Sequence, residues 1–331
     1  MKEIRWGIIG CGDVTEVKSG PAFAKATNST LVAVMRRNSA LAEDYARRHG
    51  VPRWHDDAEA IIGAPDIDAV YIATRPDSHH DYTLRCAKAG KAVYVEKPMA
   101  MTHAQCQEMV AACKAANVPL FVAYYRRAMP YMLKVKDLLD GGAIGRVAAV
   151  QVRHFARLPP VGERTGGTLP WRVDPAFGNG GIFFETVCHA IDILDFFFGE
   201  ITGTRGFAAN VAGAYPPEDT VTASFAFASG VTGCGLWCFA TDRESDEIEV
   251  VGTDGSLSFH PFSFLPIRLT RASEVSEFPI VNPNHVQQPL IQTIVNELNG
   301  VGRCPSTGLS AARTARVIEE ILKDYQAAVR R

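Results

Sequence analysis

The sequence has no apolar run that approaches the roughly 20 residues of a membrane-spanning helix. No apolar signal segment precedes the first predicted strand, since Met1–Trp6 leads straight into it. Charge of one sign is not in excess either, because 34 Lys and Arg oppose 36 Asp and Glu for a net charge of −2. This balance argues against nucleic acid or an anionic membrane as the main partner.

The cysteines form no recognisable framework. Eight are present at irregular spacing, and no Cys-x-x-Cys pair occurs among them. We therefore expect scattered core thiols, with neither a metal site nor a disulfide scaffold. A reducing compartment suits such thiols, so the expected location is the cytoplasm.

The 331 residues suggest two domains at about 150 residues each. In the first third, short apolar runs alternate with helical patterns, which predicts a doubly wound parallel sheet. The expected strands are Arg5–Ile9, Leu31–Val34, Ala69–Ile72, Ala92–Val95 and Leu120–Ala123. The expected helices are Ala40–His49, His79–Ala89 and His103–Ala116. We predict a dinucleotide-binding Rossmann domain over residues 1–123.

The remaining residues, 124–331, predict an α+β domain. A strand over Val147–Phe155 and a strongly apolar helix over Ile182–Phe198 precede a series of alternating runs. These runs are typical of antiparallel strands: Thr202–Val211, Thr220–Phe227, Gly230–Ala240, Asp246–Val251 and Gly255–Phe259. Helices near Gln287–Asn299 and Leu309–Val329 end the chain, and the last helix is expected to pack back on the first domain. One sheet face then needs a cover, so we expect a homodimer or homotetramer through it.

The first motif with chemical meaning is a glycine turn between the first strand and a helix. Gly10 can make the tight turn, and Gly12 lets a pyrophosphate approach the backbone at the start of the helix. Thr15 stands where this fingerprint has its third glycine. The alternative is an ordinary glycine turn, but the position after the first strand favours nucleotide binding.

Two arginines follow the second predicted strand. NAD-binding sites usually have a carboxylate here for the ribose 2′-hydroxyl, but this sequence has Arg36 and Arg37. A guanidinium suits the 2′-phosphate of NADP in charge and in geometry. The pattern favours NADP over NAD, with a pair of solvated surface arginines as the alternative.

Two further sites carry groups suited to acid–base chemistry. Lys97, in Glu96-Lys97-Pro98, follows a later parallel strand and can donate hydrogen bonds to a substrate oxygen. Glu185 and His189 are four residues apart on a predicted helix and therefore share one face, which Asp192 extends. The alternatives are a surface Glu-Lys turn and a helix face with a hydrogen-bonded His and two solvated acids.

Taken together, these motifs resemble the Gfo/Idh/MocA oxidoreductases, named for glucose–fructose oxidoreductase and inositol dehydrogenase. The resemblance covers essentially the whole chain and includes the segment Ala73–His79. It implies a Rossmann domain followed by a domain with a large, open, mostly antiparallel sheet. It also implies NADP or NAD as cofactor, held by the following residues: Gly10, Gly12, Asp13, Val14, Arg36, Arg37, Ala73, Thr74, Pro76, His79, Glu96, Lys97 and Arg172.

The resemblance further implies hydride transfer to or from a carbinol carbon of a sugar, polyol or related small molecule. Lys97 is then expected to bind the reacting oxygen and His189 to act as general acid and base, with Glu185 beside them. The sequence departs from the family at Glu185, where Asp is usual, and at Val187, where Gly is usual. Two alternatives stay open: a dinucleotide-binding sensor or regulator without turnover, and a redox-neutral enzyme, such as a glycosidase, that uses tightly held cofactor.

Overall fold

The computed structural model describes residues 1–158, 169–174 and 181–329. The chain forms two compact units, Met1–Met129 with Asn282–Ala312 and Pro130–Val281 with Arg313–Arg331. The division expected after residue 123 thus lies after Met129 in the structure, and a later segment returns to the first unit. Hydrogen bonds explain that return, because Ser306 Oγ donates to the Val122 carbonyl over 2.7 Å and Thr307 forms a β-bridge with Phe121.

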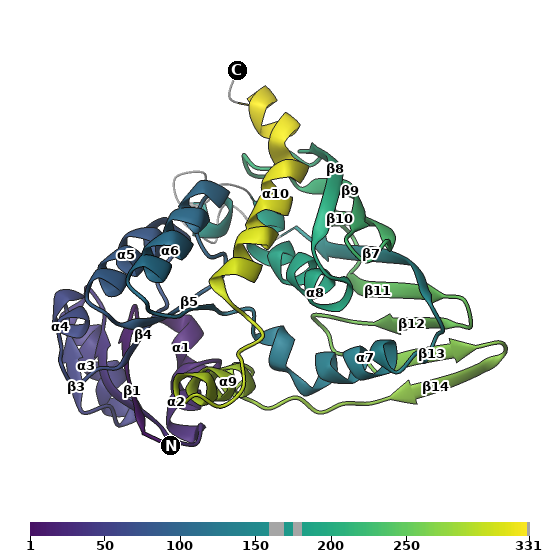
Figure 1. The fold of residues 1–331 in the computed structure, drawn as a ribbon. Coiled ribbons are helices and arrows are strands. Elements are labelled where there is room, and N and C mark those ends of the chain that lie inside the picture. The colour runs from purple at the N-terminus through teal and green to yellow at the C-terminus, as the bar shows by residue number, and fades with distance from the viewer. Residues whose placement is uncertain (159–168, 175–180, 330–331) are drawn as a thin grey trace. The chain divides into compact units, whose positions relative to one another are not determined.

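The first unit contains a six-stranded parallel sheet, as predicted (Figure 1). Its strands are β1 (Ile4–Ile9), β2 (Ser29–Met35), β3 (Arg53–His55), β4 (Ala69–Ile72), β5 (Ala92–Val95) and β6 (Leu120–Val122). Their spatial order is β3-β2-β1-β4-β5-β6, which is the Rossmann order. The order reverses between β1 and β4, and ligands of such sheets bind at the carboxyl ends of the strands beside this point.

Helices cover the parallel sheet on both faces, with α5 and α6 on one side of β4 and β5 and α2 and α9 on the other (Figure 1). The α-helices are α1 (Asp13–Val17), α2 (Gly20–Lys25), α3 (Ser39–His49), α4 (Glu59–Ile62), α5 (His79–Lys88), α6 (His103–Ala115) and α9 (Gln288–Leu298). Two short 3-10 turns are η1 (Pro76–Ser78) and η2 (Tyr125–Ala128). Because both faces are covered, β4 and β5 are buried at every residue.

The second unit contains an eight-stranded sheet with the order β14-β13-β12-β11-β7-β10-β9-β8. Its strands are β7 (Val147–Arg157), β8 (Ile201–Ala209), β9 (Thr220–Phe227), β10 (Thr232–Thr241), β11 (Ser245–Gly252), β12 (Ser256–Phe259), β13 (Ile267–Arg271) and β14 (Glu274–Phe278). Neighbouring strands run antiparallel, except for the parallel pair β7 and β10. The predicted fold class, Rossmann plus a mostly antiparallel open sheet, is confirmed.

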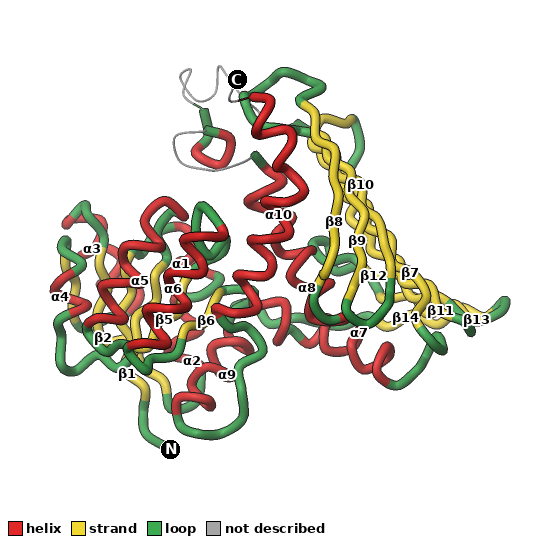
Figure 2. The backbone as a smooth tube through the Cα atoms, turned by 45° about the horizontal axis from the view of Figure 1, so that its top comes forward, coloured by secondary structure: helices red, strands yellow, loops and turns green. Residues whose placement is uncertain are grey.

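Helices pack on one face of this second sheet, which Figure 2 shows nearly edge-on with α8 to one side. The helical elements are α7 (Pro130–Asp140), η4 (Trp171–Val173), η5 (Phe183–Val187), α8 (Cys188–Phe198) and α10 (Gly308–Val329), in which the division between the units falls. Phe183 packs edge-on against Trp237 at 5.3 Å between ring centroids. The helix predicted over Ile182–Phe198 is present, with a π-helical first part, η5, before α8. None of the helices in the described ranges is long and apolar enough to cross a membrane.

Candidate functional site

The turn after β1 uses its two glycines for different purposes. Gly10 has a φ of +94°, and a Cβ there would lie 2.7 Å from Thr74 Cγ2 and 3.0 Å from the Ala73 carbonyl carbon. A Cβ on Gly12 would meet nothing closer than the Gly10 carbonyl oxygen at 3.9 Å. Gly10 is therefore required for packing against the loop that follows β4, whereas Gly12 leaves open space. That space beside the point where the strand order reverses fits a dinucleotide pyrophosphate.

Thr15 fills the third fingerprint position by holding the turn together. Its side chain is fully buried, and Oγ1 donates to the Gly12 carbonyl over 2.7 Å. Its own carbonyl accepts a hydrogen bond of 2.9 Å from the Tyr45 hydroxyl. Burial also raises the pKa of the neighbouring Cys11 thiol to about 11, so this thiol stays neutral. Other nucleotide-binding turns have a glycine at this position, which allows close packing. Here the hydrogen bonds of Thr15 and Tyr45 hold the turn instead.

The two arginines after β2 differ in exposure. Arg36 is partly buried, and its Nη1 donates to the Cys11 carbonyl over 3.5 Å, at the limit of a hydrogen bond. Arg37 is exposed. The structure thus directs Arg36 along the glycine turn, beside Gly12, where Asp13 and Val14 begin α1. A cationic group at this place is available to an anionic group on the ribose.

The loop after β4 is joined to the turn after β5 by one buried imidazole. His79 is fully buried, and its Nδ1 lies 2.9 Å from the Pro98 carbonyl oxygen and its Nε2 3.0 Å from the Thr74 carbonyl oxygen. The same loop contains Ala73 and the buried Pro76. His79 therefore holds two loops at the carboxyl edge of the sheet, and a direct contact with cofactor stays a prediction.

Glu96 and Lys97 do not form a surface turn. Glu96 is 6% exposed, and its Oε2 accepts the Lys97 backbone N–H over 3.1 Å. The Tyr71 hydroxyl donates to Glu96 Oε1 over 2.6 Å. Lys97 itself is partly exposed and precedes a cis peptide bond to Pro98. A buried carboxylate therefore fixes the backbone of the lysine that we predict to bind the reacting oxygen.

The second unit holds the predicted acid–base groups in a buried setting. Glu185 is 7% exposed, His189 6% and Asp192 1%, so the alternative with two solvated acids is wrong. Glu185 lies in the π-helical turn η5, and His189 lies in the first turn of α8. π-Helical turns inside longer helices frequently mark functional sites. Buried carboxylates beside a histidine are suited to tuning or orienting its ring.

Arg172 approaches this group from η4. Its Nε lies 3.7 Å from Glu185 Oε1, and its guanidinium lies 4.6 Å from the centre of the Trp171 ring. The Arg172 side chain is 56% exposed, so the ion pair is open to solvent. The family resemblance predicts a cofactor contact for Arg172, and the structure pairs Arg172 with the candidate acid–base carboxylate.

Glu218, a residue not predicted from the sequence, holds the start of the same helical segment. Its Oε1 accepts the Gly181 backbone N–H over 3.1 Å, and its side chain is almost fully buried. Burial raises the pKa of this carboxyl to about 7, against the partial opposition of the Gly181 hydrogen bond. A Cβ on Gly181 would lie 2.9 Å from the Glu218 carbonyl oxygen, so glycine is required there. The acid pair Glu218-Asp219 directly before β9 was the available signal.

The predicted site residues thus fall into two groups. Within the first unit, the structure brings the glycine turn, the loop after β4 and the Lys97 turn together at one edge of the sheet, through Gly10, Arg36 and His79. Within the second unit, it pairs Arg172 with Glu185 and places His189 on the same helical segment. The first group can hold a dinucleotide and donate to a reacting oxygen. The second can move a proton.

Comparisons with protein families match both units. Residues 4–124 match the oxidoreductase family with an NAD-binding Rossmann fold, and residues 132–258 match the GFO/IDH/MocA C-terminal domain. Oxidoreductase P35 of Formosa agariphila is 39% identical over 318 residues, covering 96% of this chain and 97% of its own. The 1,5-anhydro-D-fructose reductase of Ensifer adhaerens is 29% identical over 312 residues, covering 92% of this chain and 91% of its own.

Solved structures show the same fold. A levoglucosan dehydrogenase in complex with NADH and levoglucosan superposes with a TM-score of 0.86 at 22% identity, over 98% of each chain.

Proposed function

The chain belongs to the Gfo/Idh/MocA family of oxidoreductases, and from this premise we propose that it transfers a hydride between NADP(H) and a carbinol or carbonyl carbon of a sugar, polyol or related small molecule. The observation that carries the proposal is the placement of Lys97. It follows β5, the strand next to β4, at the carboxyl edge of the parallel sheet, on a backbone held by the buried Glu96. A lysine so placed is within the region where parallel sheets bind their ligands.

The cofactor preference rests on the arginines after β2. The family match supports a dinucleotide, and Arg36 and Arg37 stand where a carboxylate would favour NAD. Arg36 runs along the glycine turn and is partly buried, so it is restricted before any ligand binds. A restricted guanidinium loses less entropy on binding a phosphate than a free one. These features support NADP, with Gly10, Gly12, Asp13 and Val14 along the pyrophosphate.

The substrate class rests on the relatives. A relative that is 29% identical over nearly its whole length is named as a reductase of 1,5-anhydro-D-fructose, a sugar derivative. Buried ionisable groups such as Glu185 and His189 suit a polar substrate with hydroxyl groups, since such groups need hydrogen-bonding partners when water is displaced. We therefore expect a sugar or a polyol rather than an apolar alcohol.

The residues of the chain then divide the chemistry between them. When bound, the dinucleotide supplies or accepts the hydride. In the reducing direction, Lys97 Nζ donates a hydrogen bond to the carbonyl oxygen and stabilises the negative charge that develops on it. The imidazolium of His189 gives a proton to that oxygen and becomes a neutral imidazole, and Glu185 orients or electrostatically tunes the ring.

A panel of sugars and polyols tests the proposal, with NADP⁺ and NAD⁺ offered in turn and reduction followed at the nicotinamide absorbance band. Turnover with NADP⁺ supports it. Dinucleotide binding without turnover on any member of the panel contradicts it and favours a sensor. Product formation without a net change in nicotinamide absorbance, by protein that purifies with cofactor, favours redox-neutral chemistry instead. Lys97→Met is the matching variant, because near-normal single-turnover hydride transfer in it would rule out the role given to Lys97.

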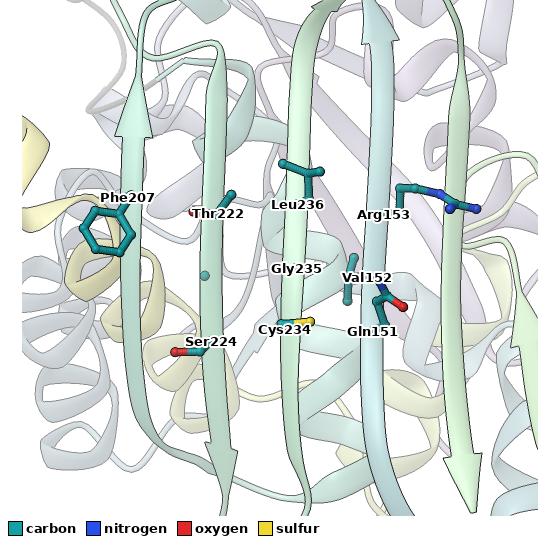
Figure 3. A pocket seen from close by; sticks show the side chains of 10 residues that line it. Gln151, Val152, Arg153, Phe207, Thr222, Ser224, Cys234, Gly235 and Leu236 are labelled. Atoms are coloured by element: carbon teal, nitrogen blue, oxygen red, sulfur yellow. The ribbon is translucent and has the colours of Figure 1, made fainter.

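The outer face of the second sheet leads us to propose a homo-oligomer. Phe207 is 83% exposed on β8 and Leu236 39% exposed on β10, and both point outward from the sheet (Figure 3). A hollow on this face is lined by Gln151, Val152, Arg153, Phe207, Thr222, Ala223, Ser224, Cys234, Gly235 and Leu236. An exposed apolar patch with a polar rim is typical of a protein interface. A second copy suits it, because a two-fold interface sets one patch against itself.

The oligomeric state can be measured by light scattering after gel filtration. Phe207→Glu with Leu236→Glu should shift the protein to the monomer, since the change buries four charges across a two-fold interface. Val281→Glu is the matched control, since Val281 is 90% exposed and lies outside this sheet. A monomeric wild type at micromolar concentration, or an oligomer that survives the double change, contradicts the proposed interface.

A cytoplasmic location stays our proposal. None of the eight cysteines, all of which lie in the described part of the chain, forms a disulfide, and six of them are buried. Disulfides form in oxidising compartments, and thiols stay reduced in the cytoplasm. A protein without disulfides therefore suits a reducing compartment. Fractionation of cells that express the protein tests this location, and recovery outside the cytoplasm would contradict it.

A further inference from the structure

Gln287 is a buried amide that contacts the Lys97 turn from far along the sequence. It precedes α9 and is fully buried. Its Oε1 accepts from the Tyr94 hydroxyl over 2.6 Å, and its Nε2 donates to Glu96 Oε1 over 2.7 Å. Its backbone N–H donates to the Lys18 carbonyl over 3.2 Å, which fixes the residue at both ends. The side chain therefore uses its donor and its acceptor within one network.

The Glu96 carboxylate is the centre of this network. Three donors reach it: the Tyr71 hydroxyl at 2.6 Å, the Gln287 amide at 2.7 Å and the Lys97 backbone N–H at 3.1 Å. A buried carboxylate needs such donors, because its lone pairs have no water to accept from. Loss of one donor leaves part of the charge uncompensated and changes where the carboxylate lies.

The two tyrosines of the network stay protonated. Burial, followed by the nearby charge of Glu96, raises the pKa of both Tyr71 and Tyr94 well above the usual value. Their rings stack at 4.8 Å between centroids, from the adjacent strands β4 and β5. Both hydroxyls therefore remain fixed donors, and Gln287 is the member that enters from outside the sheet.

We propose that Gln287 is a positioning residue for Lys97. By holding Glu96, it fixes the backbone from which Lys97 reaches the reacting oxygen. The inference rests on the proposed function, which assigns that contact to Lys97. The amide must therefore act on the geometry of the turn after β5 and not only on the packing of α9.

The first test is Gln287→Leu, which keeps a side chain of similar size and removes both amide hydrogen bonds. Single-turnover hydride transfer should fall about 10- to 100-fold, because misplacement of a catalytic group by about 1 Å costs up to about 100-fold. Amide hydrogen exchange at Lys97, measured by mass spectrometry or NMR without cofactor, should become about tenfold faster, since its acceptor is less restrained.

The second test is Gln287→Glu, which keeps the shape and the acceptor for Tyr94. At low pH the new carboxyl is protonated and still donates to Glu96. As the pH rises the proton is lost, and two carboxylates meet beside the two protonated tyrosines, Tyr71 and Tyr94. The ratio of variant to wild-type turnover should therefore fall as the pH rises. A purely structural role for Gln287 predicts a ratio that does not change with pH in the folded protein.

Gln292 on α9 provides the matched control. Its amide also reaches the N-terminal part of the chain, since Thr27 N–H donates to Gln292 Oε1 over 2.7 Å, but it has no contact with Glu96 among the hydrogen bonds of the described residues. Gln292→Leu and Gln292→Glu should leave turnover, its pH profile and exchange at Lys97 unchanged.

The possible outcomes separate the inference from the function on which it rests. Unchanged exchange at Lys97 in Gln287→Leu overturns the inference, whatever the activity. Equal losses of turnover in the Gln287 and Gln292 variants overturn it as well. A wild type that turns over no member of the panel refutes the proposed function, and the exchange measurement alone then decides whether Gln287 braces the turn.

Discussion

The guanidinium of Arg172 lies 3.7 Å from the carboxylate of Glu185, measured from Nε to Oε1. The Arg172 side chain is 56% exposed, whereas the Glu185 side chain is 9% exposed, so an exposed cation is paired with a buried acid. This relationship gives Glu185 a positive partner outside its own helix. Arg172 can therefore act in two ways, as a cofactor contact or as a partner of the acid–base group. Dinucleotide affinity measures the first role, and kcat measures the second.

Arg172→Ala should lower kcat by no more than about fivefold and leave the dissociation constant of the dinucleotide unchanged. The effect is small because an ion pair this exposed is worth about 0.2–1 kcal/mol. Stopped-flow hydride transfer and fluorescence titration of NADPH measure the two quantities. Arg205→Ala is the control, since Arg205 also pairs with a glutamate, Glu320, at 2.7 Å in the same unit. Weaker dinucleotide binding with unchanged kcat would instead support the cofactor contact.

Arg36 and Arg37 should set the cofactor preference. Replacing both with Ala should lower kcat/KM for NADP⁺ about 10- to 100-fold, because hydrogen bonds to charged groups are worth about 1.5–3 kcal/mol. The value for NAD⁺ should change much less, since NAD⁺ has no 2′-phosphate. Steady-state kinetics with both dinucleotides measure the ratio. Arg47→Ala is the control, because Arg47 is exposed and pairs with Asp44 on α3. An equal loss with both dinucleotides would contradict the preference.

Gly10 and Gly12 form a matched pair of substitution sites. Gly10→Ala should destabilise the protein by about 1–3 kcal/mol, because its φ is positive and the new Cβ would meet the loop after β4. Gly12→Ala should leave stability within about 0.5 kcal/mol and weaken dinucleotide binding, since its Cβ enters open space. Urea denaturation and NADPH titration separate the two effects. Equal losses of stability in both variants would contradict the division of roles.

The sequence was sufficient for the strands that are buried on both faces. The apolar runs predicted Ala69–Ile72 and Ala92–Val95 at the bounds that β4 and β5 have in the structure. It did not indicate β3, β13 or β14. Each is only three to five residues long, too short for a clear periodic pattern, and β3 and β14 lie at sheet edges, where burial imposes no apolar pattern.

The sequence predicts those residues of the candidate site that directly follow a predicted strand. Gly10, Gly12 and Lys97 each follow a predicted strand at a fixed place, and the structure gathers their loops at one edge of the sheet. Gln287 could not be found this way, and the acid pair Glu218-Asp219 marked Glu218 without indicating its partner. Gln287 contacts Glu96 across 191 residues, and Glu218 contacts Gly181 across 37, so their positions depend on tertiary packing.

Glu218 should make stability depend on pH. Burial raises its pKa in the folded protein to about 7 from an ordinary value of 4.5. Between these values the unfolded chain loses the proton while the folded chain keeps it. The free energy of unfolding therefore falls as the pH rises through this window, by about 3 kcal/mol for 2.5 pH units. Below pH 4.5 the contribution is constant, because the group is protonated in both states.

Glu218→Gln should remove this dependence and retain the Gly181 N–H as a donor to an amide oxygen. The variant should therefore gain stability relative to the wild type between pH 4.5 and pH 8, measured by urea denaturation at several values across the window. Glu244→Gln is the control, because Glu244 is exposed. Its substitution should change the free energy of unfolding by the same amount at both ends of the pH range. A difference between wild type and Glu218→Gln that changes by less than about 1 kcal/mol across the window would contradict a raised pKa. The carboxyl would then be ionised in the folded protein, and the hydrogen bond from Gly181 would have to offset the cost of burying its charge.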